Sequence, residues 1–429
     1  MKKFLHIFNT LLFAGAICVA FTACRDEVKS TMTYTANEPV YMSFSEFRTT
    51  RAAQPAQEMV NPGKICLYGD YLFINEVDKG IHIIDNSNPA KPYPLAFIEL
   101  PGNVDIAVRN NVLYADSYID LVWFDISNPA MPVEAGRLPD AFQNVYPGID
   151  NDYPIAGVDN TKGVIVGWTV KEVTVDANTS GYPHWYRWEC ANCRFSDVAL
   201  GSWANKGTAG ATALNGSMAR FAAYNDYLYV VNEGRLKVFS LDGEVVSKVH
   251  EQYLTWNVET IFPYNNKLFF GTTTGMLIYN IADNPVAPQY LSSVIHVLGC
   301  DPVVVQGNYA YVTIRGGNAC GQTESQLNVV DISNPAAPYT RATFIMGSPY
   351  GLGIDGNSLF VCDDGLKVFD ATTPAMVGDR LLEHFNEING FDVIPYNNVL
   401  ILIGSDGLCQ YDYSDLQNIH LLSVLNVKK

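Results

Sequence analysis

The chain has 429 residues, a formal net charge of −17 and an isoelectric point near 4.7. Because binding to nucleic acid requires a basic surface, this charge argues against DNA or RNA as partners, and it disfavours docking on anionic lipid. Tyrosine (25) and phenylalanine (21) are abundant, short apolar runs end in Gly, Asn or Pro, and no helical periodicity follows the N-terminus, so the sequence predicts an all-β protein.

Residues 1–23 have the features of a signal peptide. Lys2 and Lys3 precede an apolar run that ends in Phe-Thr-Ala-Cys at 21–24. This ending resembles the lipobox of bacterial lipoproteins, which implies that Cys24 becomes the first mature residue and carries a lipid. Cleavage without lipidation is the alternative. The acidic residues that follow Cys24 resemble an export signal, which implies an outer-membrane lipoprotein that faces outward.

Residues 24–62 are polar and rich in Thr, Ala, Gln and Pro. We expect them to form a membrane tether, with a short strand at 40–44.

A repeated unit of four short strands fills residues 63–429. Its first and second strands meet at a two-residue turn of the kind that tolerates positive φ. An additional candidate turn, Asp159-Asn160, precedes apolar runs at 163–170 and 173–176. Counting it gives eight units, and leaving out this divergent unit gives seven. The clear turns stand at 69–70, 110–111, 225–226, 265–266, 307–308, 356–357 and 397–398.

A period of about 40–50 residues with four strands per unit is typical of a β-propeller. We therefore predict a single propeller of four-stranded blades, eight by the full count and seven as the alternative. An open β-solenoid is less consistent, because the tight turns suit antiparallel blades.

The third strand carries the most regular motif, which is strong in four units and degraded in the others. It reads IHIID at 81–85, LVWFD at 121–125, LNVVD at 327–331 and LKVFD at 366–370, followed by an SNP or TTP turn. This pattern resembles the LVIVD repeat, and the resemblance implies a propeller in an extracytoplasmic protein but no defined activity. An aspartate at the same place in many blades is expected to accept hydrogen bonds within its own turn. By this reasoning Asp125 belongs to the scaffold, and Trp123 packs between blades.

The longest insertion covers 176–218. It concentrates aromatic residues, among them Trp185, Tyr186 and Trp188. Such rings can bind a sugar or a protein partner, or they can form a small core that holds the loop together.

Two disulfides are expected. Cys190 and Cys193 form a lone CxxC, for which a local disulfide fits an oxidising compartment better than a metal or redox site. Cys300 and Cys320 lie at the same end of one unit and would fix the loop at 315–326. Cys66, Cys362 and Cys409 lie in apolar strands and are expected to be buried.

The starts of the first strands should border the axis of the ring. A cation or polar ligand at this channel mouth is one interpretation, and a water-filled tunnel with charged walls is the other. No cofactor is otherwise expected. The charged residues at these positions are Lys64, Asp105, Arg220, Glu259, Asp301 and Asp392.

Together these features predict a surface-anchored, non-enzymatic lipoprotein that binds a protein or glycan through its insertion face. The alternatives are a glycan-active hydrolase that uses the channel-mouth carboxylates, and a structural subunit of an envelope complex. Sequence signatures of a nucleophile elbow, a zinc protease or a phosphate-binding loop are absent.

Overall fold

The computed structural model describes residues 31–428 except 144, 177–213, 244, 256–257, 297–298, 300–301 and 317–323. The chain divides into two compact units. The smaller contains Met1–Pro39, Asp150–Val158 and Thr169–Tyr186, and the larger contains the rest of the chain.

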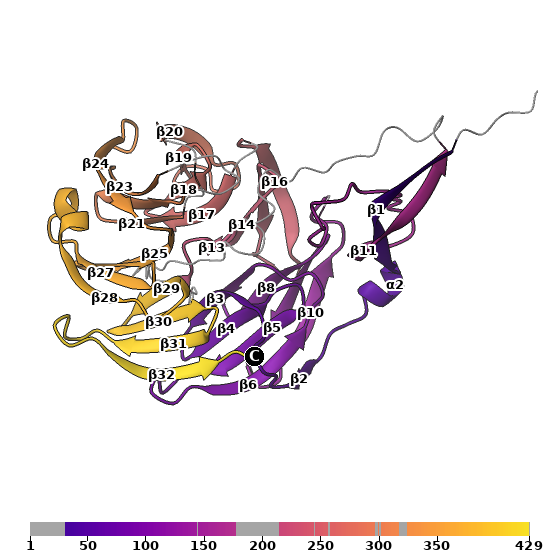
Figure 1. Ribbon diagram of the computed structural model, residues 1–429, viewed down its shortest axis with the longest axis horizontal. Helices are drawn as coiled ribbons and strands as arrows, with labels where there is room; N and C mark the ends of the chain where they lie inside the picture. The colour runs from indigo at the N-terminus through magenta and orange to yellow at the C-terminus, as the bar shows by residue number, and fades with distance from the viewer. Residues whose placement is uncertain are drawn as a thin grey trace, which may run out of the picture. The chain divides into compact units, whose positions relative to one another are not determined.

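The larger unit is a β-propeller of seven four-stranded antiparallel blades, which follow one another around a ring (Figure 1). Blade 1 consists of β3 (Pro62–Tyr68), β4 (Tyr71–Glu76), β5 (Gly80–Asp85) and β6 (Tyr93–Glu99). Blade 2 consists of β7 (Ile106–Arg109), β8 (Val112–Ser117), β9 (Asp120–Asp125) and β10 (Val133–Leu138). Blade 3 consists of β13 (Phe221–Tyr224), β14 (Tyr227–Asn232), β15 (Arg235–Ser240) and β16 (Ser247–Tyr253), and blade 4 of β17 (Val258–Tyr264), β18 (Lys267–Thr272), β19 (Gly275–Asn280) and β20 (Gln289–Ile295). Blade 5 consists of β21 (Val303–Gln306), β22 (Tyr309–Ile314), β23 (Ser325–Asp331) and β24 (Tyr339–Met346). Blade 6 consists of β25 (Pro349–Asp355), β26 (Ser358–Asp363), β27 (Leu366–Asp370) and β28 (Leu381–Phe385). Blade 7 consists of β29 (Gly390–Tyr396), β30 (Val399–Gly404), β31 (Gly407–Asp412) and β32 (His420–Asn426). A short 3-10 helix, η2 (Pro374–Asp379), joins the last two strands of blade 6.

The count of eight units was wrong, and the alternative of seven blades is correct. The segment expected to be a divergent third blade instead forms one long strand, β11 (Val164–Asp176), which pairs with β1 (Thr31–Met42) in a separate two-stranded sheet. Asp159 does not open a hairpin, because its Oδ1 accepts hydrogen bonds from the N–H and the hydroxyl of Thr161, 3.1 and 2.6 Å away. These hydrogen bonds form a local side-chain turn, which uses the same residue types as a hairpin turn and so has a similar sequence pattern.

The seven remaining turns are confirmed as tight hairpins. Residues in them adopt positive φ, including Gly69, Asn110, Asn225, Asn265 and Asn397. Asparagine and glycine tolerate this backbone conformation, and it matches the twist of the strands on either side.

The repeated aspartates stabilise turns, as the sequence predicts. Oδ1 of Asp125 accepts the N–H of Ser127 at 2.8 Å, and Oδ1 of Asp331 accepts the N–H and the hydroxyl of Ser333. These hydrogen bonds to the carboxylate lower the pKa of both aspartates.

Apolar packing between neighbouring blades forms the core. Trp123 of blade 2 is buried in one cluster with Phe221 and Leu228 of blade 3, which confirms it as a packing residue. Cys66, Cys362 and Cys409 are also buried, as predicted, and they are free thiols.

An N-terminal strap, residues 44–60, crosses the outer edges of blades 1 and 2. It begins with the one-turn helix α2 (Phe44–Phe47), whose Phe47 is fully buried. Ala52 then bridges Val133 on the edge of blade 2, and β2 (Ala53–Pro55) pairs with β6 on the edge of blade 1. The strap therefore covers two sheet edges that would otherwise be open.

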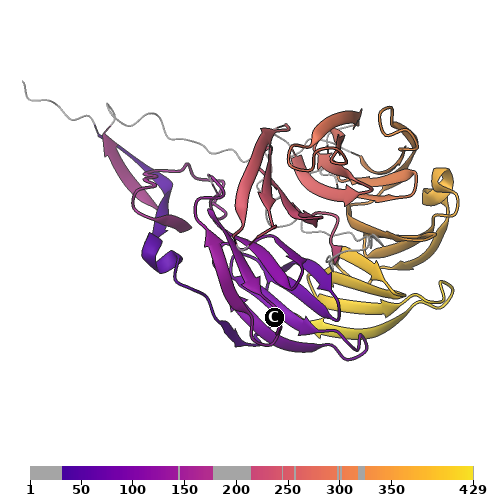
Figure 2. The same cartoon turned by 180° about the vertical axis from the view of Figure 1, so that it is seen from behind.

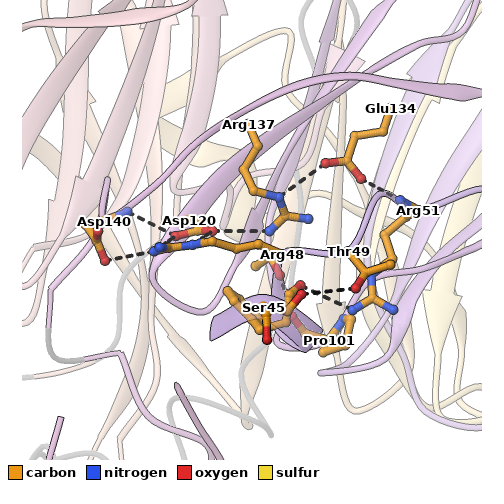
Figure 3. A network of polar contacts seen from close by, with 11 residues as sticks. Ser45, Arg48, Thr49, Arg51, Pro101, Asp120, Glu134, Arg137 and Asp140 are labelled. Carbon is orange, nitrogen blue, oxygen red and sulfur yellow. Dashed lines mark hydrogen bonds and ion pairs between the residues drawn. The ribbon is translucent and has the colours of Figure 1, made fainter. Parts of the chain in front are cut away.

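Ion pairs hold the strap to blade 2 (Figure 3). Arg48 binds Asp120 through two contacts of 2.9 Å, and the Asp120 side chain is fully buried. Arg137 reaches Asp120 at 3.3 Å and Glu134 at 3.2 Å. Two arginines thus neutralise one buried carboxylate, and one of them comes from the strap.

The described part of the predicted tether, residues 31–62, contains β1, α2 and β2 and ends at the start of β3. The attachment of this segment to a membrane stays a prediction. The short strand expected at 40–44 is the end of β1. Among the described residues, no helix is long and apolar enough to cross a bilayer.

The first and last blades meet side by side without exchanging a strand (Figure 2). Blade 7 is made only of C-terminal residues. The N–H of Lys428 donates to the carbonyl of Met59 at 2.7 Å, which brings the end of the chain next to the strap.

Candidate functional site

Three of the six residues predicted to border the axis come together from neighbouring blades. Lys64 lies in β3 of blade 1, Asp105 directly precedes β7 of blade 2, and Arg220 directly precedes β13 of blade 3. Asp392 lies in β29 of blade 7. These first strands contact one another around the ring, so they form its inner wall.

Asp105 is the centre of this charged cluster. Its Oδ2 pairs with Nζ of Lys64, accepts the N–H of Arg220 at 2.8 Å, and lies 3.5 Å from Nε of Arg220. The side chain of Asp105 is almost completely buried, while that of Arg220 keeps 30% of its surface exposed. One carboxylate therefore joins three blades, and its charge is already balanced.

Asp116, which the sequence analysis did not single out, supports this cluster from the end of β8. Its Oδ1 accepts the N–H groups of Val104 and Asp105, at 2.7 and 2.8 Å, and the amide of Asn103 at 3.0 Å. Burial raises the pKa of Asp116 to about 6, although Arg220 opposes the shift. Asp363 ends the second strand of blade 6 and accepts two backbone N–H groups in the same manner. The recurring signal in the sequence is thus an acid at the end of a second strand.

Asp392 is also fully buried. Its Oδ1 accepts the N–H of Val393 at 2.5 Å, and among the described residues no group donates to Oδ2. Burial raises its pKa well above the usual range, and Lys64 only partly offsets this effect. Burial with one unsatisfied oxygen thus disfavours the charged form of this carboxyl group.

The axis is not an open tunnel, because residues 214–219 occupy it. This axial plug begins with β12 (Leu214–Asn215), which pairs with the innermost strand of blade 1. The amide of Asn215 donates to the carbonyls of Ile106 in blade 2 and Phe221 in blade 3.

Further contacts of the axial plug reach the other side of the ring. The hydroxyl oxygen of Ser217 accepts the N–H of Leu352 in blade 6, and the carbonyl of Ala219 accepts the N–H of Ile261 in blade 4. Leu214 is buried in the apolar cluster that joins blades 7 and 1. The expectation of a water-filled channel is wrong where this plug lies.

Metal binding finds no support in the described part of the chain, where no group of three His, Cys, Asp or Glu side chains could hold an ion. Glu259, the other described member of the predicted charged ring, lies in β17 and is partly exposed. The remaining predicted site residues lie outside the described residues. They are Cys24, Asp301, Trp185, Tyr186, Trp188 and the cysteines of both expected disulfides, Cys190, Cys193, Cys300 and Cys320.

Aromatic residues lie at the face from which the second-to-third-strand loops leave. The guanidinium of Arg315, directly after β22, stacks on the ring of Tyr350 with 4.3 Å to the centroid. The Tyr350 ring in turn lies 6.0 Å from that of Phe391 in blade 7, and both rings are partly exposed. Cation–π and aromatic contacts thus link blades 5, 6 and 7 where the loop containing 317–323 begins.

A family model for the LVIVD repeat matches residues 62–95, 102–140 and 300–344. These ranges cover most of blade 1, all four strands of blade 2 and most of blade 5. No curated protein matches the chain in sequence.

Several solved structures are similar to this chain at low sequence identity. A computationally designed protein, Ika8, has 10% identity, a TM-score of 0.47 and coverage of 87% of this chain and 91% of its own. BamB from Moraxella catarrhalis has 8% identity, a TM-score of 0.46 and coverage of 80% and 79%. PorZ, a surface component of the type-IX secretion system of Porphyromonas gingivalis, has 10% identity, a TM-score of 0.46 and coverage of 88% and 40%. With its matching repeats and its ring of blades, the chain is a seven-bladed β-propeller that carries LVIVD repeats.

Proposed function

We propose that this protein is a surface-anchored, non-enzymatic lipoprotein whose propeller binds a protein or glycan partner through the face that carries its insertions. The observation that carries this proposal is the filled axis. The axial plug occupies the position where propellers often bind a ligand, and Asp105 is balanced there by Lys64 and Arg220.

The same geometry weakens the case for a hydrolase that uses Asp105 or Asp392. A general acid or nucleophile must reach its substrate, whereas Asp105 and Asp392 are fully buried. Binding of a partner is then best assigned to the loops, which are the parts that differ between repeats.

The lipid anchor rests on the sequence alone. Lys2, Lys3 and the Phe-Thr-Ala-Cys ending at 21–24 support export and lipidation of Cys24. Metabolic labelling with a palmitate analogue tests this part, and Cys24→Ser is its control. Label that persists in Cys24→Ser would contradict the assignment.

A comparison of two variants of the full chain tests the binding face. Deletion of 178–205 is expected to abolish retention on a glycan array or in a pull-down with envelope extract, while the melting temperature stays near that of the parent. A matched variant, Asn308→Ala, alters a hairpin turn at the opposite face and is expected to retain binding. Equal binding by all three proteins would exclude the insertion as the binding element, and turnover of a glycan panel would favour the hydrolase.

Partly exposed aromatic residues provide a second, finer test. If the stack at this face takes part in binding, Tyr350→Ala and Phe391→Ala should each weaken binding. A partner that instead co-purifies in fixed stoichiometry, irrespective of these changes, would favour a structural subunit of an envelope complex.

A further inference from the structure

One position pair recurs at every junction between blades. Its first member is the central residue of a third strand. Its second member is the residue directly after the third strand of the next blade, where that strand ends in the repeat aspartate or, in blades 3 and 4, in Ser240 or Asn280. In blades 1 and 2 these are Ile83 and Ile126, which belong to the same buried cluster. In blades 3 and 4 they are Val238 and Ile281, again in one cluster.

At six of the seven junctions both members are apolar. The remaining four apolar pairs are Trp123 with Leu241, Ile278 with Ile332, Val329 with Ala371, and Val368 with Tyr413.

The seventh junction joins the last blade to the first and carries two amides. Nδ2 of Asn86 donates to Oε1 of Gln410 at 2.9 Å, and Nε2 of Gln410 donates to Oδ1 of Asn86 at 2.7 Å. Gln410 is fully buried and Asn86 nearly so. The sequence separation of 324 residues makes this a contact that only ring closure can form.

Further hydrogen bonds complete this polar junction. Nε2 of Gln410 also donates to the carbonyl of Pro89 at 3.1 Å, and the hydroxyl of Ser423 donates to the same carbonyl at 2.6 Å. The proline carbonyl of the turn is an acceptor at other junctions too, as Ser292 to Pro335 and Tyr229 to Pro285 show. The proline contact is therefore general, and the paired amides are specific to the closing junction.

We propose that Asn86 and Gln410 specify ring closure, by favouring contact between the first and last blades over every other pairing of blade faces. A wrong closure that leaves out blade 7 would place Asn86 against Val368, and a buried amide without a partner is costly. In the same way, Gln410 against an internal blade would face an apolar residue. A single buried polar pair can thus select the register of otherwise similar apolar surfaces, as buried asparagines do in coiled coils.

Refolding of the full chain from urea tests this proposal. The double variant Asn86→Ile with Gln410→Val makes the seventh junction like the other six. It is expected to keep a melting temperature at or above that of the parent, because loss of both partners is less costly than loss of one. We expect its yield of monomer, measured by size-exclusion chromatography with light scattering, to fall at least two-fold in favour of misassembled species.

The exchanged pair Asn86→Gln with Gln410→Asn is the matched control, because it keeps two amides at the junction. Its monomer yield should equal that of the parent. The proposal fails if the apolar double variant refolds to monomer as efficiently as the parent, or if the exchanged pair misassembles as much as the apolar one. If the apolar variant does not fold, the exchanged pair alone tests the proposal. A monomer yield equal to that of the parent supports the proposal, and a lower monomer yield overturns it.

Discussion

The hydroxyl oxygen of Ser217 lies 3.3 Å from the backbone nitrogen of Leu352 and accepts its hydrogen bond, although 135 residues separate them in the chain. Both groups are buried, so this contact ties the axial plug to blade 6 from within the ring.

Substitution Ser217→Ala should therefore destabilise the ring. It leaves the N–H of Leu352 without its acceptor, at a cost of about 1–3 kcal/mol in the free energy of unfolding. Urea denaturation measures this loss. Ser247→Ala, on the exposed edge strand of blade 3, is the control and should change the stability by less than about 0.5 kcal/mol. Equal effects at both positions would show that the axial plug does not hold the blades.

Loss of Arg48 should release the strap. Arg48→Ala leaves the buried carboxylate of Asp120 with Arg137 as its remaining cation, and a cost of about 1–3 kcal/mol is expected because Arg48 itself is partly exposed. Arg48→Lys should recover little of this free energy, since lysine has no planar guanidinium to bind both carboxylate oxygens of Asp120. Limited proteolysis should then cut within residues 44–60 faster than in the parent. The control Arg235→Ala removes an exposed pair with Glu251 and should leave the cleavage rate unchanged.

The stability of the propeller should depend on pH through Asp116. Its pKa of about 6 in the folded chain exceeds the ordinary value of 3.8, so the folded state binds this proton more tightly than the unfolded state. The contribution therefore favours folding at pH 4 and is lost as the pH rises through 6, by up to about 3 kcal/mol at 1.36 kcal/mol per pKa unit.

Asp116→Asn isolates this contribution, because it cannot ionise and keeps an acceptor oxygen for the same N–H groups. The difference in unfolding free energy between variant and parent should grow in favour of the variant between pH 4.5 and pH 7.5. A difference that is constant over this range would mean that Asp116 stays ionised throughout.

Removal of a repeat aspartate should affect the scaffold and not recognition. Asp331→Ala loses the hydrogen bonds to Ser333 and should lower the free energy of unfolding by about 1 kcal/mol. Because hydrogen bonds lower the pKa of Asp331, the stability that it adds is present above its ordinary pKa and disappears as the pH falls through the folded value. Retention on the partner or glycan should be unchanged, and a selective loss of binding would instead assign Asp331 to a site.

The repeat explains why much of the fold could be predicted from the sequence. Turns such as Asn110-Asn111 and third strands that end in an aspartate recur at a fixed place, and each recurrence corresponds to a blade. The prediction of eight units was wrong because the local contact between Asp159 and Thr161 uses the same residue types as a hairpin turn. The long strand β11 has no partner strand beside it in sequence, a property that the apolar pattern does not reveal.

The candidate site was predictable only in part. The starts of the first strands correctly placed Lys64, Asp105 and Arg220 together, since inner strands of neighbouring blades must meet at the axis. The axial plug has no periodic pattern and its hydrogen-bond partners lie in five blades, so no local sequence pattern predicts it. The strap was missed for a similar reason, because Arg48 and Asp120 meet only after blade 2 has formed.

The axial plug has a consequence for how the chain acquires its shape during synthesis. Residues 214–219 precede blades 3 to 7 in the chain and follow blades 1 and 2. When synthesis proceeds from the N-terminus, β12 can pair with β3 before the later blades exist. The remaining blades then fold around a segment that is already in place, and the finished ring never has to open to admit it.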